Sequence, residues 1–113
     1  MVKVEVTIQP LMLDQVKAAL ASLEVGGVTI LHVLDHAGPG GLKTTYRATE
    51  CWVDTQKVKL EMVVSALRAD EVVEVVSRAA RTGMPGNDGT IIVYEIARGF
   101  RIRNGRPAEF SLI

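Results

Sequence analysis

The sequence predicts an α+β domain in which a strand–helix–strand unit occurs twice. Residues 2–9 alternate between apolar and polar side chains, and residues 57–64 repeat this alternation at an offset of 54 positions. Each alternating stretch leads into a segment of helical period and then into a second, more apolar strand. Two such units in one short chain are typical of the ferredoxin-like double βαβ sandwich.

In the first half, the alternating strand over residues 2–9 is stopped by Pro10, which has no amide hydrogen to donate. Residues 11–25 then carry leucine and valine at every third or fourth position, which predicts an amphipathic helix closed by a Gly-Gly pair. Residues 28–36 have few polar interruptions and predict the second strand.

In the second half, residues 49–54 extend the alternating strand toward its beginning. Residues 69–83 predict the second helix, which Asp70 caps at its start and Gly83 ends. Residues 90–97 predict the last strand of the sheet.

Two further expectations concern the segment that joins the two halves and the two outer strands of the sheet. Residues 37–47 have turn composition and no period, which predicts a long, mobile loop. The strands over 28–36 and 90–97 are apolar on both faces, as in strands covered from both sides. Two helices cover only one face, so we expect another copy of the chain to cover the other.

Composition limits the class of protein. The 113 residues suffice for one domain over positions 1–113, and 48% of them are hydrophobic. The net charge of zero argues against a non-specific nucleic-acid binder. A single cysteine excludes an intrachain disulfide, and no apolar run reaches the roughly 18 residues of a membrane span. The first residues alternate at once, unlike a signal peptide, so we expect a cytoplasmic protein.

A glycine-rich loop and a cluster of arginines suggest an anion site. The stretch "GMPGNDGT" supplies backbone amides that can converge on a phosphate. Arg101 and Arg103 are two apart on a stretch predicted to be extended, which would place both side chains on one face. A tight helix–strand connection followed by a solvated basic tail is the alternative interpretation, and the spacing leaves both open.

The other polar groups do not form a recognisable catalytic or metal site. The stretch "GPGGLKT" lacks the glycine before lysine that a Walker loop needs. His32 and His36 are about 13 Å apart on a strand, too far to share a metal ion. Cys51, beside a tryptophan, is expected to be a half-buried small residue rather than a nucleophile. No motif indicates an enzyme.

The chain resembles the PII signal-transduction proteins over essentially its whole length. The matching stretches are "IQPLMLDQVKAAL", "GGVTILHV", "YRATE", "VDTQKVKLEMVV", "RAARTG", "GNDGTIIVYEIA" and "RIRNG". Of these, "RTG" with the following "DGTIIV" and "RIRNG" is the most specific combination. The resemblance implies a homotrimer of ferredoxin-like domains that binds adenine nucleotides between subunits.

The resemblance also assigns site residues. It implies adenine contacts at Gly27, Val28, Thr29, Glu61 and Val63, and a lysine of the site at Lys57. It implies a phosphate loop over about residues 82–90, with Gly86, Asp88, Gly89 and Thr90, and phosphate-pairing Arg101 and Arg103 in a tail over 98–113. It further implies a regulatory loop over about residues 37–54 that docks on a transporter or enzyme. The nucleotide is a ligand, and neither a resident cofactor nor a metal is expected.

Departures from the family pattern shape the expected function. Thr90 replaces a phosphate-facing lysine, which favours ADP or AMP over ATP. Gly38, Pro39 and Gly40 replace the Arg-Gln-Lys run that helps to hold 2-oxoglutarate, and Cys51 replaces the modified tyrosine. We therefore expect a divergent regulator with bicarbonate or a small carboxylate as second effector, at Arg47 and Arg106.

Three alternatives stay open beside this expectation. One is a nitrogen regulator that senses ATP and 2-oxoglutarate. The others are an enzyme that hydrolyses nucleotide slowly, with Asp88 as a conceivable base, and a purely structural oligomerisation module.

Overall fold

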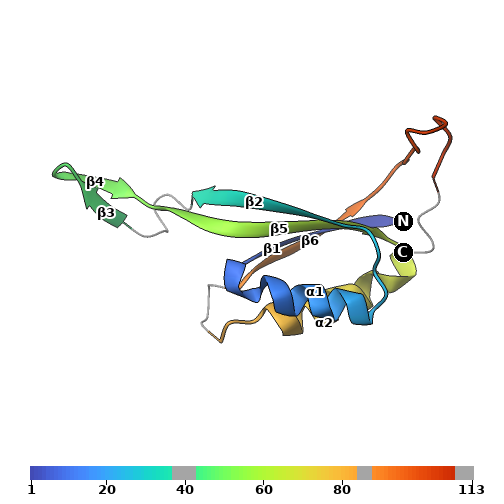
Figure 1. Ribbon diagram of the computed structural model, residues 1–113, viewed down its shortest axis with the longest axis horizontal. Helices are drawn as coiled ribbons and strands as arrows, with labels where there is room; N and C mark the ends of the chain where they lie inside the picture. Colours follow the sequence, from blue (N-terminus) through green and yellow to red (C-terminus); the bar gives the residue numbers. More distant parts are fainter. Residues whose placement is uncertain (37–42, 84–87, 109–113) are drawn as a thin grey trace.

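The computed structural model describes residues 1–36, 43–83 and 88–108. In these residues two helices cover one face of a four-stranded antiparallel sheet with strand order β2-β5-β1-β6 (Figure 1). This arrangement confirms the predicted α+β ferredoxin-like fold. The elements are β1 (Val2–Ile8), α1 (Leu13–Ser22), β2 (Val28–His36), β3 (Lys43–Tyr46), β4 (Thr49–Trp52), β5 (Asp54–Val64), α2 (Ala69–Ala80) and β6 (Gly89–Glu95).

The two central strands, β1 and β5, carry most of the core. Their register pairs Val4 with Met62 and Val6 with Leu60, so the two alternating patterns place their apolar side chains on the same face. All four side chains are at most 2% exposed. The helices cover this face with Val16 and Leu20 of α1 and Val72 and Val76 of α2, all buried.

Both helices begin and end differently from the prediction. A short 3-10 turn precedes each one, over Pro10–Met12 before α1 and Ala66–Arg68 before α2. Asp70 is therefore in the first turn of α2 and caps nothing; the cap before it is Ser65, whose Oγ accepts from the amide of Leu67 at 3.3 Å. Gly83 has a φ of +81°, but α2 already ends at Ala80 because Arg81 is extended.

The long connection contains a second, two-stranded sheet rather than only loop. β3 pairs with β4, with Tyr46 opposite Thr49, and Figure 1 shows this hairpin beyond the end of the β2–β5 ladder, away from the helices. The predictions that residues 43–47 lack regular structure and that 49–52 belong to the next strand were wrong. Residues 37–42 of the predicted loop are outside the described residues.

Two residues join β3 to β4, and both have left-handed backbone. Arg47 has a φ of +50° and Ala48 a φ of +61°, as the central residues of a type I′ turn require. Such turns usually contain Asn-Gly or Asp-Gly. The absence of these residues explains why the hairpin gave no turn signal in the sequence.

The sheet face away from the helices carries charged residues at its centre and apolar residues on its outer strands. Lys59 Nζ lies 2.9 Å from Glu5 Oε1, across the β1–β5 ladder. Leu31 of β2 is 37% exposed and Ile92 of β6 is 46% exposed. The outer strands therefore carry apolar residues on both faces, as predicted. In a single chain, many of those on the open face are exposed to solvent.

Neither helix in the described part of the chain has the length and apolarity needed to cross a membrane.

Candidate functional site: two separated corners of the sheet

The residues expected to hold adenine line one pocket at a corner of the sheet. The pocket has a volume of about 480 Å³ and lies where β2 begins and β5 ends. Thr29 is directly opposite Glu61 in the ladder, and Val28 is opposite Met62. All five expected residues are in its lining, which consists of Lys3, Gly27, Val28, Thr29, Glu61, Met62 and Val63.

The connection from α1 to β2 positions the glycine side of this adenine pocket. Val25 is buried, and its amide donates to the carbonyl of Leu20 at 3.1 Å. Glu24 takes a left-handed φ of +59°, which turns the chain back toward the sheet. The guanidinium of Arg68, from the turn before α2, donates to the carbonyl of Leu23. The α1–β2 turn is therefore tied to the second half of the chain.

Lys3 is a pocket residue that the sequence did not indicate. Its Nζ lies 3.4 Å from Glu61 Oε2 and 5.6 Å from the centre of the Tyr94 ring. Alternation places Lys3 on the open face, and antiparallel register places it beside Glu61 on the next strand. Working out that register from the two alternating strands would have found it.

The phosphate loop is closed by Asp88 at the diagonally opposite corner. Asp88 Oδ1 accepts from the Thr82 amide at 2.6 Å and from the Thr82 hydroxyl at 2.7 Å. These hydrogen bonds, the amide first, hold the pKa of the Asp88 carboxyl below its ordinary value. Thr90 is exposed and lies opposite Thr7, while Gly86 is outside the described residues.

Gly89 allows β6 to approach β1 at this corner. Its φ of +117° is rarely adopted by other residues, and a Cβ there would lie 1.9 Å from the carbonyl oxygen of Thr7. The glycine is thus required by the close approach of two backbones.

The two corners do not meet within one chain. Thr29 and Gly89 lie on opposite edge strands of the sheet, and their β1 equivalents in the register, Glu5 and Ile8, are three residues apart. Three strand spacings and three residues correspond to roughly 17 Å. The charged side chains of the open face occupy the space between the corners.

The tail that carries the arginines forms a hairpin instead of an extended stretch. The Arg101 amide donates to the Arg106 carbonyl at 2.9 Å, and the Gly105 amide donates to the Arg101 carbonyl at 2.8 Å. Asn104 Oδ1 accepts from the Arg106 amide, and Gly105 has a φ of +64°. Arg103 therefore lies in the turn, and the prediction that it shares an extended face with Arg101 was wrong, because Asn104 and Gly105 favour a turn there.

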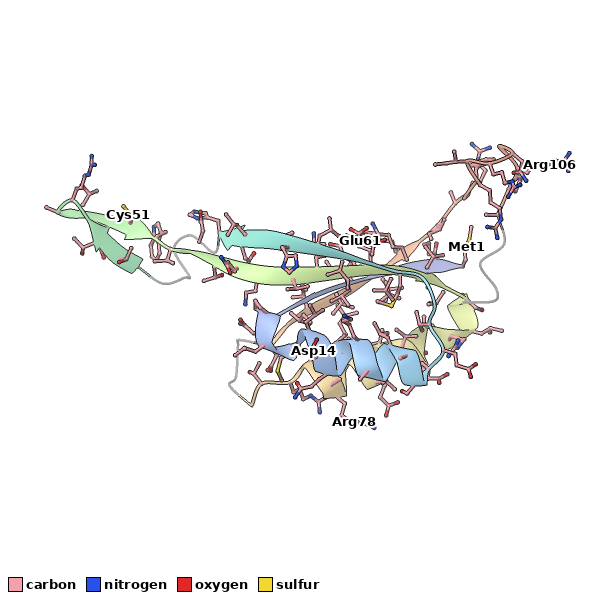
Figure 2. All side chains as sticks on the ribbon, in the orientation of Figure 1. Met1, Asp14, Cys51, Glu61, Arg78 and Arg106 are labelled. Carbon is pink, nitrogen blue, oxygen red and sulfur yellow. The ribbon has the colours of Figure 1, made fainter. Side chains whose placement is uncertain are left out.

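Three further expected site residues lie apart from both corners. Lys57 lines another pocket of about 450 Å³ with Gln56 and residues of β2. Arg47 is at the tip of the β3–β4 hairpin, while Figure 2 shows Arg106 at the opposite end of a molecule that is 56 Å long. Within one chain, Arg47 and Arg106 cannot contact the same small ligand.

The side chains of His36 and Cys51 have identifiable partners. His36 Nδ1 lies 2.5 Å from Asp54 Oδ1, at the last pair of the β2–β5 ladder. Cys51 Sγ contacts the carbonyl of Thr49 at 3.7 Å. Across residues 1–36, 43–83 and 88–108, no group of three potential metal ligands comes together.

Comparison with known proteins assigns the sequence to a family. Residues 1–106 match the family described as Nitrogen regulatory protein P-II. The chain is 39% identical to the Nitrogen regulatory protein P-II of Haemophilus influenzae and 37% identical to that of Pasteurella multocida. It is 40% identical to the Nitrogen regulatory protein P-II 1 of Escherichia coli strain K12. Each comparison extends over 113 residues and covers 99% of this chain and 100% of the relative. The chain belongs to the P-II family of signal-transduction regulators.

Proposed function

We propose that three copies of the chain associate and bind adenine nucleotides in the clefts between them. The observation that carries this proposal is the separation of the adenine pocket from the phosphate loop by roughly 17 Å on opposite edges of one sheet. A second copy can bring its adenine pocket against the phosphate loop of the first. In a closed ring of three, every such pair of corners is used.

The exposed apolar residues of the outer strands support association. Leu31 and Ile92 lie on the open face, on opposite edge strands, and each is more than one third exposed. Covering this face with other copies removes apolar area from water. The trimer therefore needs no additional segment to bury the second face of the sheet.

The phosphate loop supports a preference for ADP or AMP over ATP. The Asp88 side chain is engaged by Thr82, so it closes the loop rather than pairing with an arginine. Thr90, next to Gly89, contributes a neutral hydroxyl instead of a cation. Arg101 and Arg103, on the exposed C-terminal hairpin, supply positive charge from a neighbouring copy. One cation fewer beside the phosphates weakens binding most for the ligand with the highest negative charge.

The β3–β4 hairpin supports regulation of a partner protein. It extends past the helix-covered part of the sheet and is joined to it by the β2–β5 ladder (Figure 1). We propose that nucleotide occupancy changes the conformation of the segment over 37–54, which binds a transporter or a metabolic enzyme. The chain acts as a regulator, and bicarbonate or a small carboxylate serves as second effector.

A second candidate function is nitrogen regulation through ATP and 2-oxoglutarate. The names of the relatives favour it, since each is called a nitrogen regulatory protein. Calorimetric titration with ATP, ADP and AMP, each with and without bicarbonate or 2-oxoglutarate, separates the two. ATP binding that tightens with 2-oxoglutarate would establish the second candidate over the first.

The location of the clefts is tested with two variants that block different corners. Thr29→Trp fills the adenine pocket, and Asp88→Ala opens the phosphate loop. Each variant alone should lose ADP binding, whereas trimers formed from an equal mixture should recover about a quarter of the clefts, because only mixed neighbours combine two intact corners. Calorimetry counts the sites. A mixture that binds no more ADP than either variant alone would contradict clefts between copies.

A further inference from the structure

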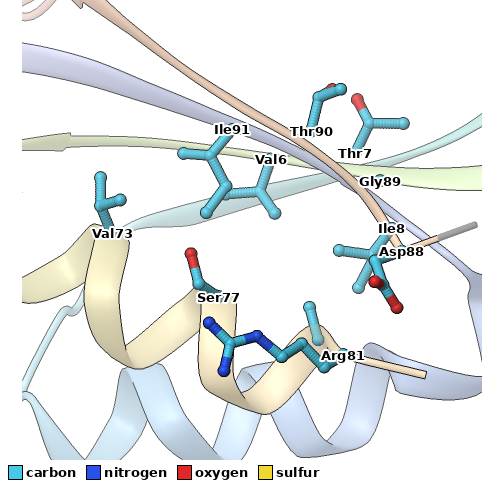
Figure 3. A pocket seen from close by; sticks show the side chains of 11 residues that line it. Val6, Thr7, Ile8, Val73, Ser77, Arg81, Asp88, Gly89, Thr90 and Ile91 are labelled. Carbon is cyan, nitrogen blue, oxygen red and sulfur yellow. The ribbon is translucent and has the colours of Figure 1, made fainter. Parts of the chain in front are cut away.

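A third pocket lies on the helix side of the phosphate loop and shares Asp88, Gly89 and Thr90 with that loop. It has a volume of about 400 Å³ and lies between the end of α2 and the neighbouring strands β1 and β6 (Figure 3). Its wall combines polar and apolar residues, and its polar groups are Thr7, Ser77, Arg81, Asp88 and Thr90. The apolar residues are Val6, Ile8, Val73, Ala80 and Ile91.

Ser77 and Arg81 form the polar end of this pocket. Ser77 is in the last turn of α2, and Arg81 is the residue that directly follows the helix. Figure 3 shows the Arg81 side chain running back along α2 toward Ser77, whose hydroxyl points toward the strands. Among the described residues, no carboxylate comes within 4.0 Å of the Arg81 guanidinium. Within the described residues the Arg81 cation is therefore in no ion pair, although, after the hydrogen bonds from Thr82, its charge contributes to the lowered pKa of the Asp88 carboxyl.

Asp88 is the nearest negative charge in the lining and sets where an anion can lie. Its Oδ1 already accepts both hydrogen bonds from Thr82. Figure 3 shows its carboxylate at the other end of the pocket, away from the Arg81 guanidinium. A ligand anion is therefore favoured only at the end that contains Ser77, with the rest of the ligand on the apolar wall.

We propose that this pocket binds a small monocarboxylate with a short aliphatic group and acts as a regulatory site behind the phosphate loop. The carboxylate accepts from Arg81 and Ser77, and the aliphatic group packs on Val73 and Ile91. One cation and an apolar wall suit a singly charged ligand better than a phosphate or a dicarboxylate. The volume has room for a chain of a few carbons.

The regulatory part of this inference rests on the proposed nucleotide binding. Gly89 and Thr90 line the pocket and also belong to the loop expected to hold phosphates. A ligand that fixes the positions of Gly89 and Thr90 lowers the entropic cost of fixing them around a nucleotide. The two ligands should therefore bind with positive coupling, and by linkage each strengthens the other equally.

Binding is tested first without nucleotide, by titrating the full chain with butyrate and following amide chemical shifts. The shifts should concentrate on Ser77, Arg81 and Ile91. Butanol, with the same aliphatic chain and no charge, should bind at least about tenfold more weakly, since it loses the charge-assisted hydrogen bonds. Shifts spread over the surface, or equal affinity for butanol, would overturn the site.

Variants on α2 then identify the residues involved. Arg81→Gln should raise the dissociation constant of butyrate about tenfold or more, and Ser77→Ala should raise it severalfold. Arg78→Gln is the matched control, because Arg78 is on the same helix, exposed, and paired with Glu74 at 2.8 Å. An effect of Arg78→Gln as large as that of Arg81→Gln would reduce the interaction to general surface charge and overturn the assignment.

Coupling is tested by measuring the ADP dissociation constant with and without saturating butyrate. A decrease of about fivefold is expected, and it should disappear in Arg81→Gln. Butyrate binding with an unchanged ADP constant would overturn the regulatory role. Butyrate binding to a chain that binds no adenine nucleotide would contradict the proposed function while leaving the carboxylate pocket in place.

Discussion

The two faces of the same sheet are built on different principles. On the helix-covered face, Val58 and Leu60 of β5 are at most 1% exposed and pack in a continuous core. On the open face, the residue between them on the same strand is Lys59, which pairs with Glu5 across the ladder. One face buries apolar volume, whereas the other aligns charges and leaves apolar side chains at its edges.

The difference separates what specifies the fold from what serves function. The covered face fixes the register, because a shift of one residue would exchange its valines for lysine and glutamate. The open face borders the pocket proposed to hold adenine, through Lys3 and Glu61. Substitutions should therefore have consequences that depend on the face they alter.

The largest loss of stability is expected at Gly89, where the backbones of β1 and β6 approach each other closely. Gly89→Ala places a Cβ against the Thr7 carbonyl and should destabilise the protein by about 3 kcal/mol or more, because β1 and β6 must separate. Urea unfolding measures the loss. Gly105→Ala is the control: its φ is also positive, but nothing lies within 4 Å, so about 1 kcal/mol is expected. Equal losses would show that the close approach is not what requires Gly89.

A smaller loss of unfolding free energy is expected from valine-to-alanine substitutions on β5, and its size should differ between the two faces of the sheet. Val58→Ala, on the covered face, should cost about 2 kcal/mol of unfolding free energy because it leaves a cavity. Val63→Ala, on the half-buried open face, should cost less than about 1 kcal/mol in dilute protein. Urea titrations at two protein concentrations should show a larger Val63→Ala penalty at the higher one, if copies cover this face. Equal losses of unfolding free energy for the two valine substitutions would show that the two faces do not differ in their contribution to stability.

The smallest effect concerns the charges of the open face and appears as a dependence on pH. The hydrogen bond from Lys59 lowers the pKa of Glu5 from its ordinary value of 4.5, and Tyr94 acts in the same direction. A lowered carboxyl pKa adds stability that is complete above the unfolded value and is lost as the pH falls through the folded one. Glu5→Gln should therefore flatten the loss of stability with acid below about pH 4.

Acid titrations of the unfolding free energy check this expectation, with Lys59→Met as the companion variant. Lys59 has a raised pKa because of Glu5, so its own contribution is lost only as the pH rises past 10.5. In acid, Lys59→Met should reproduce the flattened profile of Glu5→Gln. A profile for Glu5→Gln as steep as that of the unaltered protein would show that the pair does not stabilise the fold.

The main fold was predictable because its signals are periodic. Alternation in β1 and β5 gave both strands and the inward side chains, and the helical spacing gave the two helices, on which Val16 and Val72 are buried. The helix boundaries were not predictable in the same way. Each helix follows a 3-10 turn, whose weak sequence preferences are easily attributed to the helix itself.

The site was only partly accessible from sequence. Thr29 and Glu61 are 32 positions apart, and their pairing depends on a strand register that no local pattern states. Residue spacing alone left the anion site open, and the adenine contacts came from the family resemblance. The turn at Arg103 was misjudged because two arginines at i and i+2 look alike in a strand and in a hairpin loop. Ser77 and Arg81 drew no attention because a helix end usually has polar residues.

The left-handed turn at Arg47 and Ala48 has a consequence for exchange between conformations. Neither residue is glycine or asparagine, so the two together store on the order of 2 kcal/mol of backbone strain relative to relaxed geometry. A binding partner that straightens this turn recovers that energy. About 1.4 kcal/mol changes a population tenfold. The tip of the hairpin can therefore be remodelled at a lower free-energy cost than a tip made of Asn-Gly.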